Sequence, residues 1–219
     1  MYSQSEENYL KSLFNLANSK GEVSANDLSK MLDIKMSSVN SMMKKLAEKK
    51  LVYYESYKPL RLTEKGKKEA GLIIRKHRLT EMFLVQKMGF GWEQVHEIAE
   101  QIEHLQSPHF FEKMDEMLGY PTIDPHGSPI PDKSGKVGWV KYEKLSDCKE
   151  GDTVKLAAVI HTTDDFLKFL NLRGLSLGIQ LTIGAVEKFD GSMVISHHNK
   201  KGSFTLSHIV CDRLLVEKL

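Results

Sequence analysis

The first 63 residues alternate helical patterns with short breaks and end in two strand-like runs. Apolar residues recur at the spacing of one helix face in three stretches, which predict helices over 3–19, 24–32 and 37–49. Ser24 stands where the second of these helices begins and is its predicted N-cap. Residues 51–55 and 60–63 are apolar and aromatic runs separated by a Pro-containing turn, so we expect two short strands there.

The order helix, helix, short turn, helix and hairpin is that of a winged helix-turn-helix. In this fold the third helix enters the major groove of DNA, and its polar first turn reaches base edges or phosphates. The side chains expected to contact DNA are Ser37, Ser38, Asn40, Ser41, Lys44, Lys45 and Lys58. Such a motif can also bind proteins, but residues 1–76 carry 15 Lys and Arg against 9 Asp and Glu, which favours a polyanion.

A long helical pattern follows Thr63, its predicted N-cap, and continues to Met88, where a Gly-Phe-Gly sequence ends it. This helix carries His77 and Glu81. The two residues are four positions apart, so their side chains lie on one face.

A further helix, predicted over 92–106, has an apolar stripe and beside it a stripe of carboxylates and imidazoles. His96, Glu100, Glu103 and His104 share an arc of about 100° on the helix wheel. Carboxylates beside an apolar stripe repel one another and lose hydration unless a positive charge lies between them. A divalent cation supplies that charge, and residues 77–132 are acidic overall. The stripe therefore predicts a metal site, with a solvated helix face as the alternative.

The remainder of the chain divides into an amphipathic helix, a Pro-rich linker and a β-rich end. The face formed by Phe110, Phe111, Met114 and Met117 suits either a dimer contact or the chain's own core. After the linker, short runs separated by glycine turns predict a small β-barrel. Its strands are expected over 151–160, 178–189, 192–197, 203–206 and 209–216, with a short helix over 164–172.

Composition and the lack of certain motifs argue against several classes of protein. The 219 residues contain no apolar run near the about 20 residues that a membrane span needs, and the N-terminus lacks the apolar core of a signal peptide, so we expect a cytoplasmic protein without a membrane partner. Cys148 and Cys211 are far apart and are expected to be buried thiols. Neither a nucleophile motif, nor a Gly-rich phosphate loop, nor an H-E-x-x-H pattern is found, which argues against an enzyme and a small-molecule substrate.

Three motifs carry a resemblance to a known family. They are R-K-H-R-L-x-E from Arg75, V-H-E-x-A-E-x-I-E-H from Val95, and L-x-F-L-x-x-R-G-L-x-x-G from Leu167. With the winged helix-turn-helix order, they resemble the diphtheria-toxin-repressor/MntR family of metal-dependent transcriptional repressors over essentially the whole chain.

The resemblance implies a mainly α fold with a small β domain. The expected parts are a winged helix-turn-helix over 1–75, a helical metal-binding and dimerisation domain over 76–120, a Pro-rich linker over 121–140 and a C-terminal SH3-like (FeoA-type) β-barrel over 141–219.

The resemblance also implies two metal sites. The residues matched to a primary, regulatory site are Asn8, Glu100, Glu103 and His104. Those matched to a second site are His77, Glu81, His96 and Asp165, with Asp164 as the alternative to the last. The metal-loaded protein is expected to bind palindromic operator DNA as a homodimer and to control metal-uptake genes.

Two positions depart from the manganese-type members of the family. Asn8 stands where they have Asp, and Lys11 stands where some have a Glu ligand. The loss of negative charge predicts weaker binding, or one metal position in place of a binuclear pair. Glu100 stands where iron-type members carry Cys, and a carboxylate favours Mn²⁺, with Fe²⁺ as the second candidate and Zn²⁺ or Co²⁺ as substitutes in vitro. The alternative function is a winged-helix regulator that responds to another ligand, with the Glu/His stripe structural.

Overall fold

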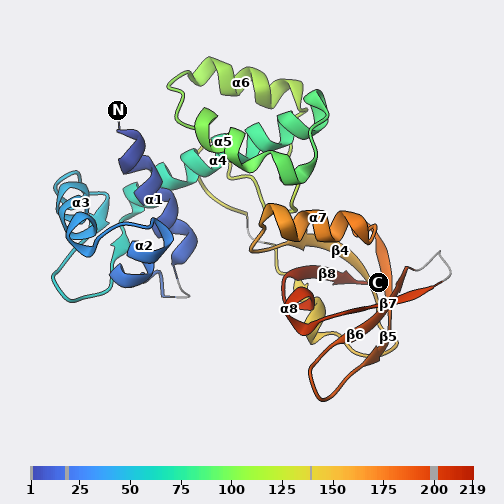
Figure 1. Cartoon of the computed structure of the whole chain (residues 1–219). Coiled ribbons are helices and arrows are strands. Elements are labelled where there is room, and N and C mark those ends of the chain that lie inside the picture. The colour runs from blue at the N-terminus through green and yellow to red at the C-terminus, as the bar shows by residue number, and fades with distance from the viewer. Residues whose placement is uncertain (1, 18–19, 139, 198–201) are drawn as a thin grey trace. The chain divides into compact units, whose positions relative to one another are not determined.

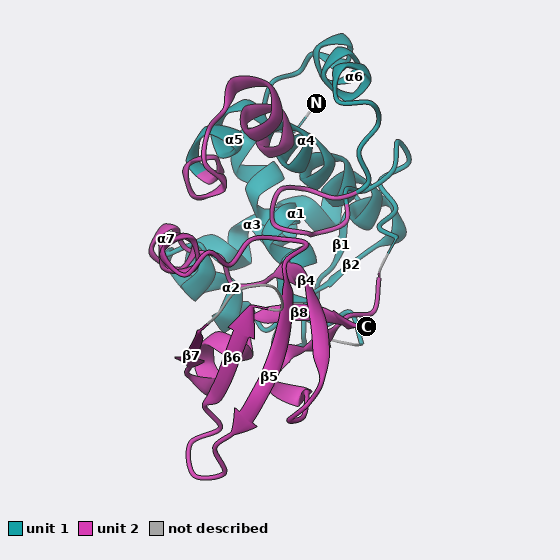
Figure 2. Ribbon diagram, turned by 90° about the vertical axis from the view of Figure 1, so that its right-hand side faces the viewer, with its two compact units in different colours: residues 1–80, 97–122, 130–138 teal, residues 81–96, 123–129, 139–219 magenta. Residues whose placement is uncertain are grey.

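A computed structural model describes residues 2–17, 20–138, 140–197 and 202–219. The chain forms two compact units, which Figure 2 shows in different colours. Unit 1 comprises residues 1–80, 97–122 and 130–138, and unit 2 comprises residues 81–96, 123–129 and 139–219. No helix in the described part of the chain is long and apolar enough to cross a membrane.

Unit 1 is helical and carries a short hairpin (Figure 1). Its elements in chain order are α1 (Gln4–Leu16), α2 (Ala25–Met31), α3 (Met36–Glu48), β1 (Val52–Tyr53), β2 (Arg61–Leu62), the first part of α4 (Glu64–Met88), most of α5 (His96–Ile102) and α6 (Pro108–Met117). This order confirms the predicted winged helix-turn-helix, although the two strands of the wing are only two residues each. Their register pairs Val52 with Leu62 and Tyr53 with Arg61.

Local signals explain where these helices begin. Ser3 and Glu6 form a capping box at the start of α1, and the Ser24 hydroxyl accepts hydrogen bonds from two backbone N–H groups of α2. The Thr63 hydroxyl likewise accepts from the Gly66 N–H at the start of α4. The core beneath them joins α1, α2, α3, the hairpin and α4 through fully buried residues such as Leu10 and Leu46.

One glycine of α4 permits a close backbone approach. A Cβ at Gly71 would lie 2.0 Å from the carbonyl oxygen of Gly135, so only a residue without a side chain fits there. Residues 130–138 pack against α4 at this point. Arg75, one turn later, donates to the Pro131 carbonyl oxygen at 2.6 Å and holds the same segment.

The single helix predicted over 92–106 is wrong. The chain forms a 3₁₀ turn, η1 (Trp92–Gln94), then the short α5, and it leaves the helix before Glu103. Leu105 N–H bonds to the Ile102 carbonyl three residues back, which tightens the end of the helix. Pro108 begins the next helix at its first position, and the residue before a proline is disfavoured in the α region, which separates α6 from the segment before it.

Unit 2 is built on a six-stranded antiparallel sheet, consistent with an SH3-like domain. The strand order is β3-β8-β4-β5-β6-β7, and Figure 1 labels each of these strands except β3. The elements are β3 (Glu143–Lys144), η2 (Leu145–Asp147), β4 (Thr153–Val159), α7 (Asp164–Leu172), β5 (Gln180–Val186), β6 (Met193–His197), β7 (Ser203–Leu206), α8 (His208–Cys211) and β8 (Leu214–Lys218). The strand predicted over 209–216 is corrected: its first part is α8, and the strand begins at Leu214.

The core of unit 2 is formed by buried residues of the sheet and of α7. Helix α7 has the predicted bounds because Thr163 caps it and because Phe166, Leu167 and Leu170 recur on its buried face. The two cysteines are buried free thiols, as predicted, and burial raises the pKa of Cys211 to about 12.

Candidate metal centre

Glu103 is the buried centre of a group of polar side chains in unit 1. Its carboxylate is fully buried and contacts His77 Nδ1 at 2.5 Å through one oxygen and Lys11 Nζ at 2.7 Å through the other. Burial acts to raise the pKa of Glu103, but the His77 imidazole and the Lys11 ammonium outweigh it and hold that pKa below its ordinary value. The carboxylate is therefore ionised at neutral pH.

Lys11 joins helix α1 to this group. Its ammonium contacts Glu100 at 2.5 Å as well as Glu103, and its side chain is only 14% exposed. Ligand atoms of His77, Glu100 and Glu103 lie within 4.8 Å of one another. We call Lys11, His77, Glu100 and Glu103 the Glu103 cluster. Sequence reasoning singled out all four positions, but the Lys11 contact spans about ninety residues and no local pattern predicts it.

Helix α1 reaches the same segment through a second pair. Glu7, which sequence reasoning missed, accepts from His104 Nδ1 at 2.6 Å and from the Gln106 amide at 3.0 Å. Glu7 is buried although it lies in the first turn of a helix, where a carboxylate usually faces solvent. The only sequence signal was its neighbour, Asn8.

Two buried polar atoms, one on α1 and one just after α5, have no hydrogen-bond partner among the described residues. They are Asn8 Oδ1 and His104 Nε2. The His104 side chain is 10% exposed, and its Nε2 lies 3.6 Å from Glu103. Buried polar atoms without partners are costly, so each needs a reason. A divalent ion held by an amide oxygen, an imidazole nitrogen and a carboxylate satisfies all three groups, and this donor set fits Mn²⁺ or Fe²⁺.

A second group of potential ligands lies in unit 2. Ligand atoms of Glu81, Asp124 and His126 fall within 4.8 Å of one another, and all three residues are buried. The Glu81 carboxylate contacts His96 Nδ1 at 2.6 Å and His126 Nδ1 at 3.7 Å, and the two imidazole rings stack with centroids 4.7 Å apart. We call Glu81, His96, Asp124 and His126 the Glu81 cluster.

Backbone hydrogen bonds position the Glu81 cluster. The Asp124 carboxylate accepts from the backbone N–H groups of His126 and Ser128, which makes a tight turn in the Pro-rich segment. His126 Nε2 contacts the Trp92 carbonyl oxygen at 2.9 Å. Burial acts to lower the pKa of His126, but the Glu81 carboxylate outweighs it and raises that pKa. Sequence reasoning missed Asp124 and His126 because the segment resembled a plain linker.

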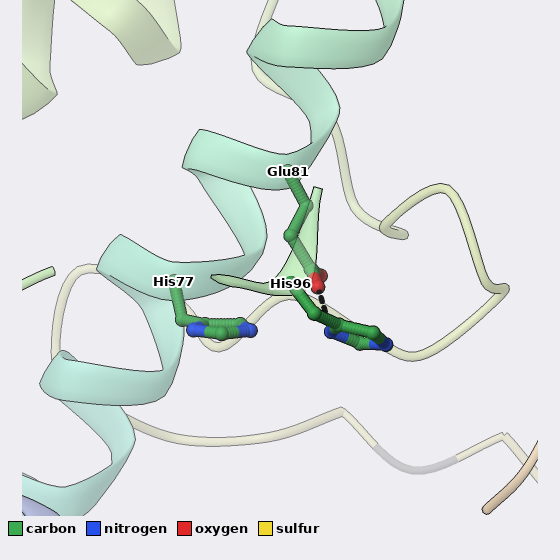
Figure 3. A group of neighbouring side chains, drawn as sticks. All are labelled: His77, Glu81 and His96. Carbon is green, nitrogen blue, oxygen red and sulfur yellow. Dashed lines mark ion pairs between the residues drawn. The ribbon is translucent and has the colours of Figure 1, made fainter. Parts of the chain in front are cut away.

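Of the predicted second-site residues, the structure brings Glu81 and His96 into contact but leaves Asp165 apart from them. Figure 3 shows His77 and Glu81 on successive turns of α4, with the Glu81 carboxylate paired to His96. Asp165 is exposed in the first turn of α7 and belongs to no group of potential ligands in the described ranges, and the same holds for Asp164. Thr162 is the residue that instead contacts His96, with its hydroxyl 2.9 Å from Nε2. The placement therefore does not support Asp165 as a ligand.

The predicted DNA-contacting side chains lie on one face of α3 and on the wing. Ser37, Ser38, Asn40, Ser41, Lys44, Lys45 and Lys58 are all exposed. Val39, Met43 and Leu46 form the buried face of the same helix. Exposed polar and basic residues opposite a buried apolar face match a helix that is free to enter a groove.

One of these lysines also holds α3 to α1. Glu6 accepts from Lys49 at 2.5 Å and contacts Lys45 at 3.2 Å, and the Glu6 side chain is 2% exposed. Burial acts to raise the pKa of Glu6, but the lysines and the Ser3 backbone lower it to about 2. Lys45 is 53% exposed, so it can still reach DNA, but part of its charge is neutralised within the chain.

Two family models match this chain. Residues 1–60 match "Iron dependent repressor, N-terminal DNA binding domain", and residues 63–132 match "Iron dependent repressor, metal binding and dimerisation domain". The second match contains the Glu103 cluster apart from Lys11, and it also reaches Asp124 and His126.

Known proteins and solved structures agree with these matches. The HTH-type transcriptional regulator MntR of Oceanobacillus iheyensis is 32% identical over 120 residues, 55% of this chain and 81% of that protein. The iron-dependent repressor IdeR of Mycobacterium tuberculosis is 32% identical over 125 residues, 57% of this chain, and the match spans only about half (54%) of that protein.

The structural likeness covers nearly the whole chain. A manganese-dependent transcriptional repressor in complex with manganese has a TM-score of 0.88 at 30% identity, covering 98% of this chain and 100% of that one. IdeR from T. acidophilum has a TM-score of 0.76 at 29% identity, with both chains fully covered. By sequence and by structure, this chain belongs to the iron-dependent repressor family.

Proposed function

We propose that this protein is a metal-dependent transcriptional repressor of the cytoplasm. In this proposal a homodimer loaded with Mn²⁺, or with Fe²⁺, binds palindromic operator DNA and controls metal-uptake genes. The observation that carries the proposal is the position of helix α1. It contributes Lys11 and Glu7 to the contacts with Glu103 and His104, and it contributes Glu6 to the contacts with helix α3.

The residues that would hold the regulatory ion are Asn8, Glu103 and His104. The bound ion would supply positive charge to a buried carboxylate and would give the buried amide oxygen and imidazole nitrogen the partner that they lack among the described residues. Asn8 lies on α1 and the other two residues follow α5, so holding them together fixes α1 against the residues after α5.

The route from this site to DNA runs through α1. Glu6 and Asn8 are two residues apart on that helix, and Glu6 is paired with Lys45 and Lys49 at the end of α3. A shift of α1 therefore moves the helix proposed to enter the major groove. In a homodimer the two such helices must match the spacing of two half-sites, so their orientation sets the affinity.

The Glu81 cluster is proposed as a second divalent-ion site. It offers a buried carboxylate and imidazoles, which suit Mn²⁺, Fe²⁺ and Zn²⁺ alike. Glu81 and His96 keep the role first expected from the sequence. His77 is placed with Glu103 instead, and Asp124 and His126 replace Asp165 in the proposed ligand set. Glu81 and His96 are positioned by α4 and α5, and Asp124 and His126 by the turn that follows Ile123.

The proposed dimer surface includes part of α6. Phe111 and Met114 are buried in the chain's own core, whereas Phe110 and Met117 are 43% and 49% exposed. Phe111 and Met114 therefore belong to the chain's own core, and Phe110 and Met117 are the residues proposed for the dimer surface. Exposed aromatic and methionine side chains on one helix are typical of an interface.

Fluorescence anisotropy on DNA from the protein's own upstream region tests the function. Protein is titrated with chelator, with Mn²⁺ and with anaerobic Fe²⁺ at one fixed salt concentration, because affinity for DNA depends strongly on salt. We expect tight binding only with metal. Equal binding with chelator and with metal would refute metal dependence and would favour a winged-helix regulator of another ligand.

Two matched variants test the ligand assignment. His104→Ala removes a proposed ligand, and His109→Ala removes an imidazole that is fully exposed on α6. The first is expected to abolish the response to metal and the second to leave it unchanged. A normal metal response in His104→Ala would contradict the proposed site.

A further inference from the structure

We propose that the Lys11 ammonium is a built-in cation that takes the place of a second divalent ion, so that the Glu103 cluster and its neighbours bind one ion per subunit. The inference rests on the ligand set proposed above. It concerns how many ions the site accepts, and it can fail while metal-dependent repression stands.

Lys11 lies at a place with the ligand chemistry of a cation site. Its Nζ contacts Glu100 at 2.5 Å and Glu103 at 2.7 Å, two of the three members of the group whose ligand atoms lie within 4.8 Å of one another. The third member, His77, contacts the other oxygen of Glu103 at 2.5 Å. Hydrogen bonds between an ammonium and carboxylates are charge-assisted, and here one ammonium is shared by two carboxylates.

The partnerless atoms point to where the divalent ion binds. Asn8 Oδ1 and His104 Nε2 have no hydrogen-bond partner in the described part of the chain, whereas Glu100 and His77 are engaged in the Glu103 cluster. The cluster and its surroundings therefore divide into two halves that share Glu103. Lys11 holds one half, and the Asn8 and His104 half remains for one ion.

A second ion would have to displace Lys11 or bind beside it. Displacement removes both carboxylate partners of an ammonium whose side chain is 14% exposed, and an unpaired buried charge is strongly unfavourable. Binding beside the ammonium places two cations on the same carboxylates. Either way, the second ion is opposed by a charge that the chain itself supplies.

Reversing the charge at position 11 should allow a second divalent ion to bind. Lys11→Glu lowers the formal charge of the site by two units, which is the charge of one divalent ion. It also adds a carboxylate where the ammonium was. Lys11→Arg is the matched control, because it keeps the positive charge and can bond the same two carboxylates.

The test is Mn²⁺ stoichiometry by equilibrium dialysis with metal analysis, together with electron paramagnetic resonance of the bound ions. All proteins carry Glu81→Gln, so that the Glu81 cluster does not add to the count. Two Mn²⁺ ions that share a carboxylate are magnetically coupled, whereas a single ion gives an uncoupled six-line spectrum. This readout is independent of DNA.

We expect one uncoupled ion per subunit with Lys11 and with Lys11→Arg, and two coupled ions with Lys11→Glu. Two coupled ions with Lys11 in place would overturn the inference. A Lys11→Glu protein that folds but still binds one ion would also overturn it. If neither Lys11 nor Lys11→Arg bound Mn²⁺ here, the ligand set itself would be wrong.

Protection of Lys11 from an amine-reactive label gives a second measurement that needs no charge reversal. We expect Lys11 to be equally protected with and without saturating Mn²⁺, as read by peptide mass spectrometry. An increase in labelling of Lys11 on adding Mn²⁺ would show that metal displaces it, and this would overturn the inference.

Discussion

Glu6→Gln isolates the charge that holds helix α1 to α3. Glutamine has nearly the same shape as glutamate and can still serve as the third residue of the capping box with Ser3, so the change removes the negative charge and little else. Glu6 is 2% exposed, and its contacts with Lys45 and Lys49 are the only carboxylate pairing of those two lysines among the residues described.

The magnitude follows from the pKa. A carboxyl group whose pKa falls from 4.5 to about 2 on folding stabilises the folded state at neutral pH. At about 1.4 kcal/mol per pKa unit this amounts to roughly 3 kcal/mol. The two lysines are half-exposed, so solvent screening reduces it, and we expect Glu6→Gln to lower the free energy of unfolding by about 2 kcal/mol at pH 7.

The sign of the pH dependence makes the test specific. Because the pKa of Glu6 is lowered on folding, its stabilisation is present above pH 4.5 and is lost as the pH falls towards 2. Urea unfolding of both proteins between pH 7 and pH 2.5 should give curves that converge at low pH. A difference that is constant with pH, or one below about 0.5 kcal/mol at pH 7, would refute this reasoning.

Two further substitutions test the fold and the DNA surface. Gly71→Ala should lower stability by about 1–3 kcal/mol in thermal unfolding, because its Cβ would lie 2.0 Å from the Gly135 carbonyl oxygen. The control Gly138→Ala has open space around its Cβ and should be nearly neutral. Equal effects of the two substitutions would contradict the close approach. Lys44→Ala should weaken DNA binding and reduce the slope of log affinity against log salt concentration by about 1. The control Lys168→Ala on α7 should change neither quantity. An unchanged slope in Lys44→Ala would show that this residue does not contact DNA phosphates.

Much of the helical architecture could be predicted because the local signals agree with one another. Helix α7 has an N-cap at Thr163 and apolar residues at i, i+3 and i+4, and its bounds were predicted without error. The winged helix-turn-helix was recognisable for the same reason: its caps and breaks lie in the sequence itself.

Helix α5 shows where the periodicity of apolar residues misleads. Apolar residues continue at helical spacing past Ile102, so a helix to residue 106 was expected. The helix nevertheless ends at Ile102, and Glu103 and His104 lie in the turn that follows. Glu103 and His104 therefore remain predicted ligands, and the turn that carries them could not be predicted from the apolar periodicity.

Contacts between residues distant in sequence could not be predicted. Lys11 and Glu103 are far apart in the chain, and so are Glu7 and His104. Asp124 and His126 lie in a Pro-rich segment whose composition is typical of a solvated linker, yet both side chains are buried. Burial of a charged residue depends on its partners, and partners are set by tertiary structure.

Reciprocal coupling between metal and operator tests the central claim most directly. If metal and DNA affinities are coupled, Mn²⁺ must bind more tightly to the DNA-bound protein than to free protein, by the same factor by which Mn²⁺ tightens DNA binding. Isothermal titration of Mn²⁺ with and without operator DNA measures this factor, which we expect to be about 5–150-fold. Equal Mn²⁺ affinity in the two titrations would contradict metal-dependent repression.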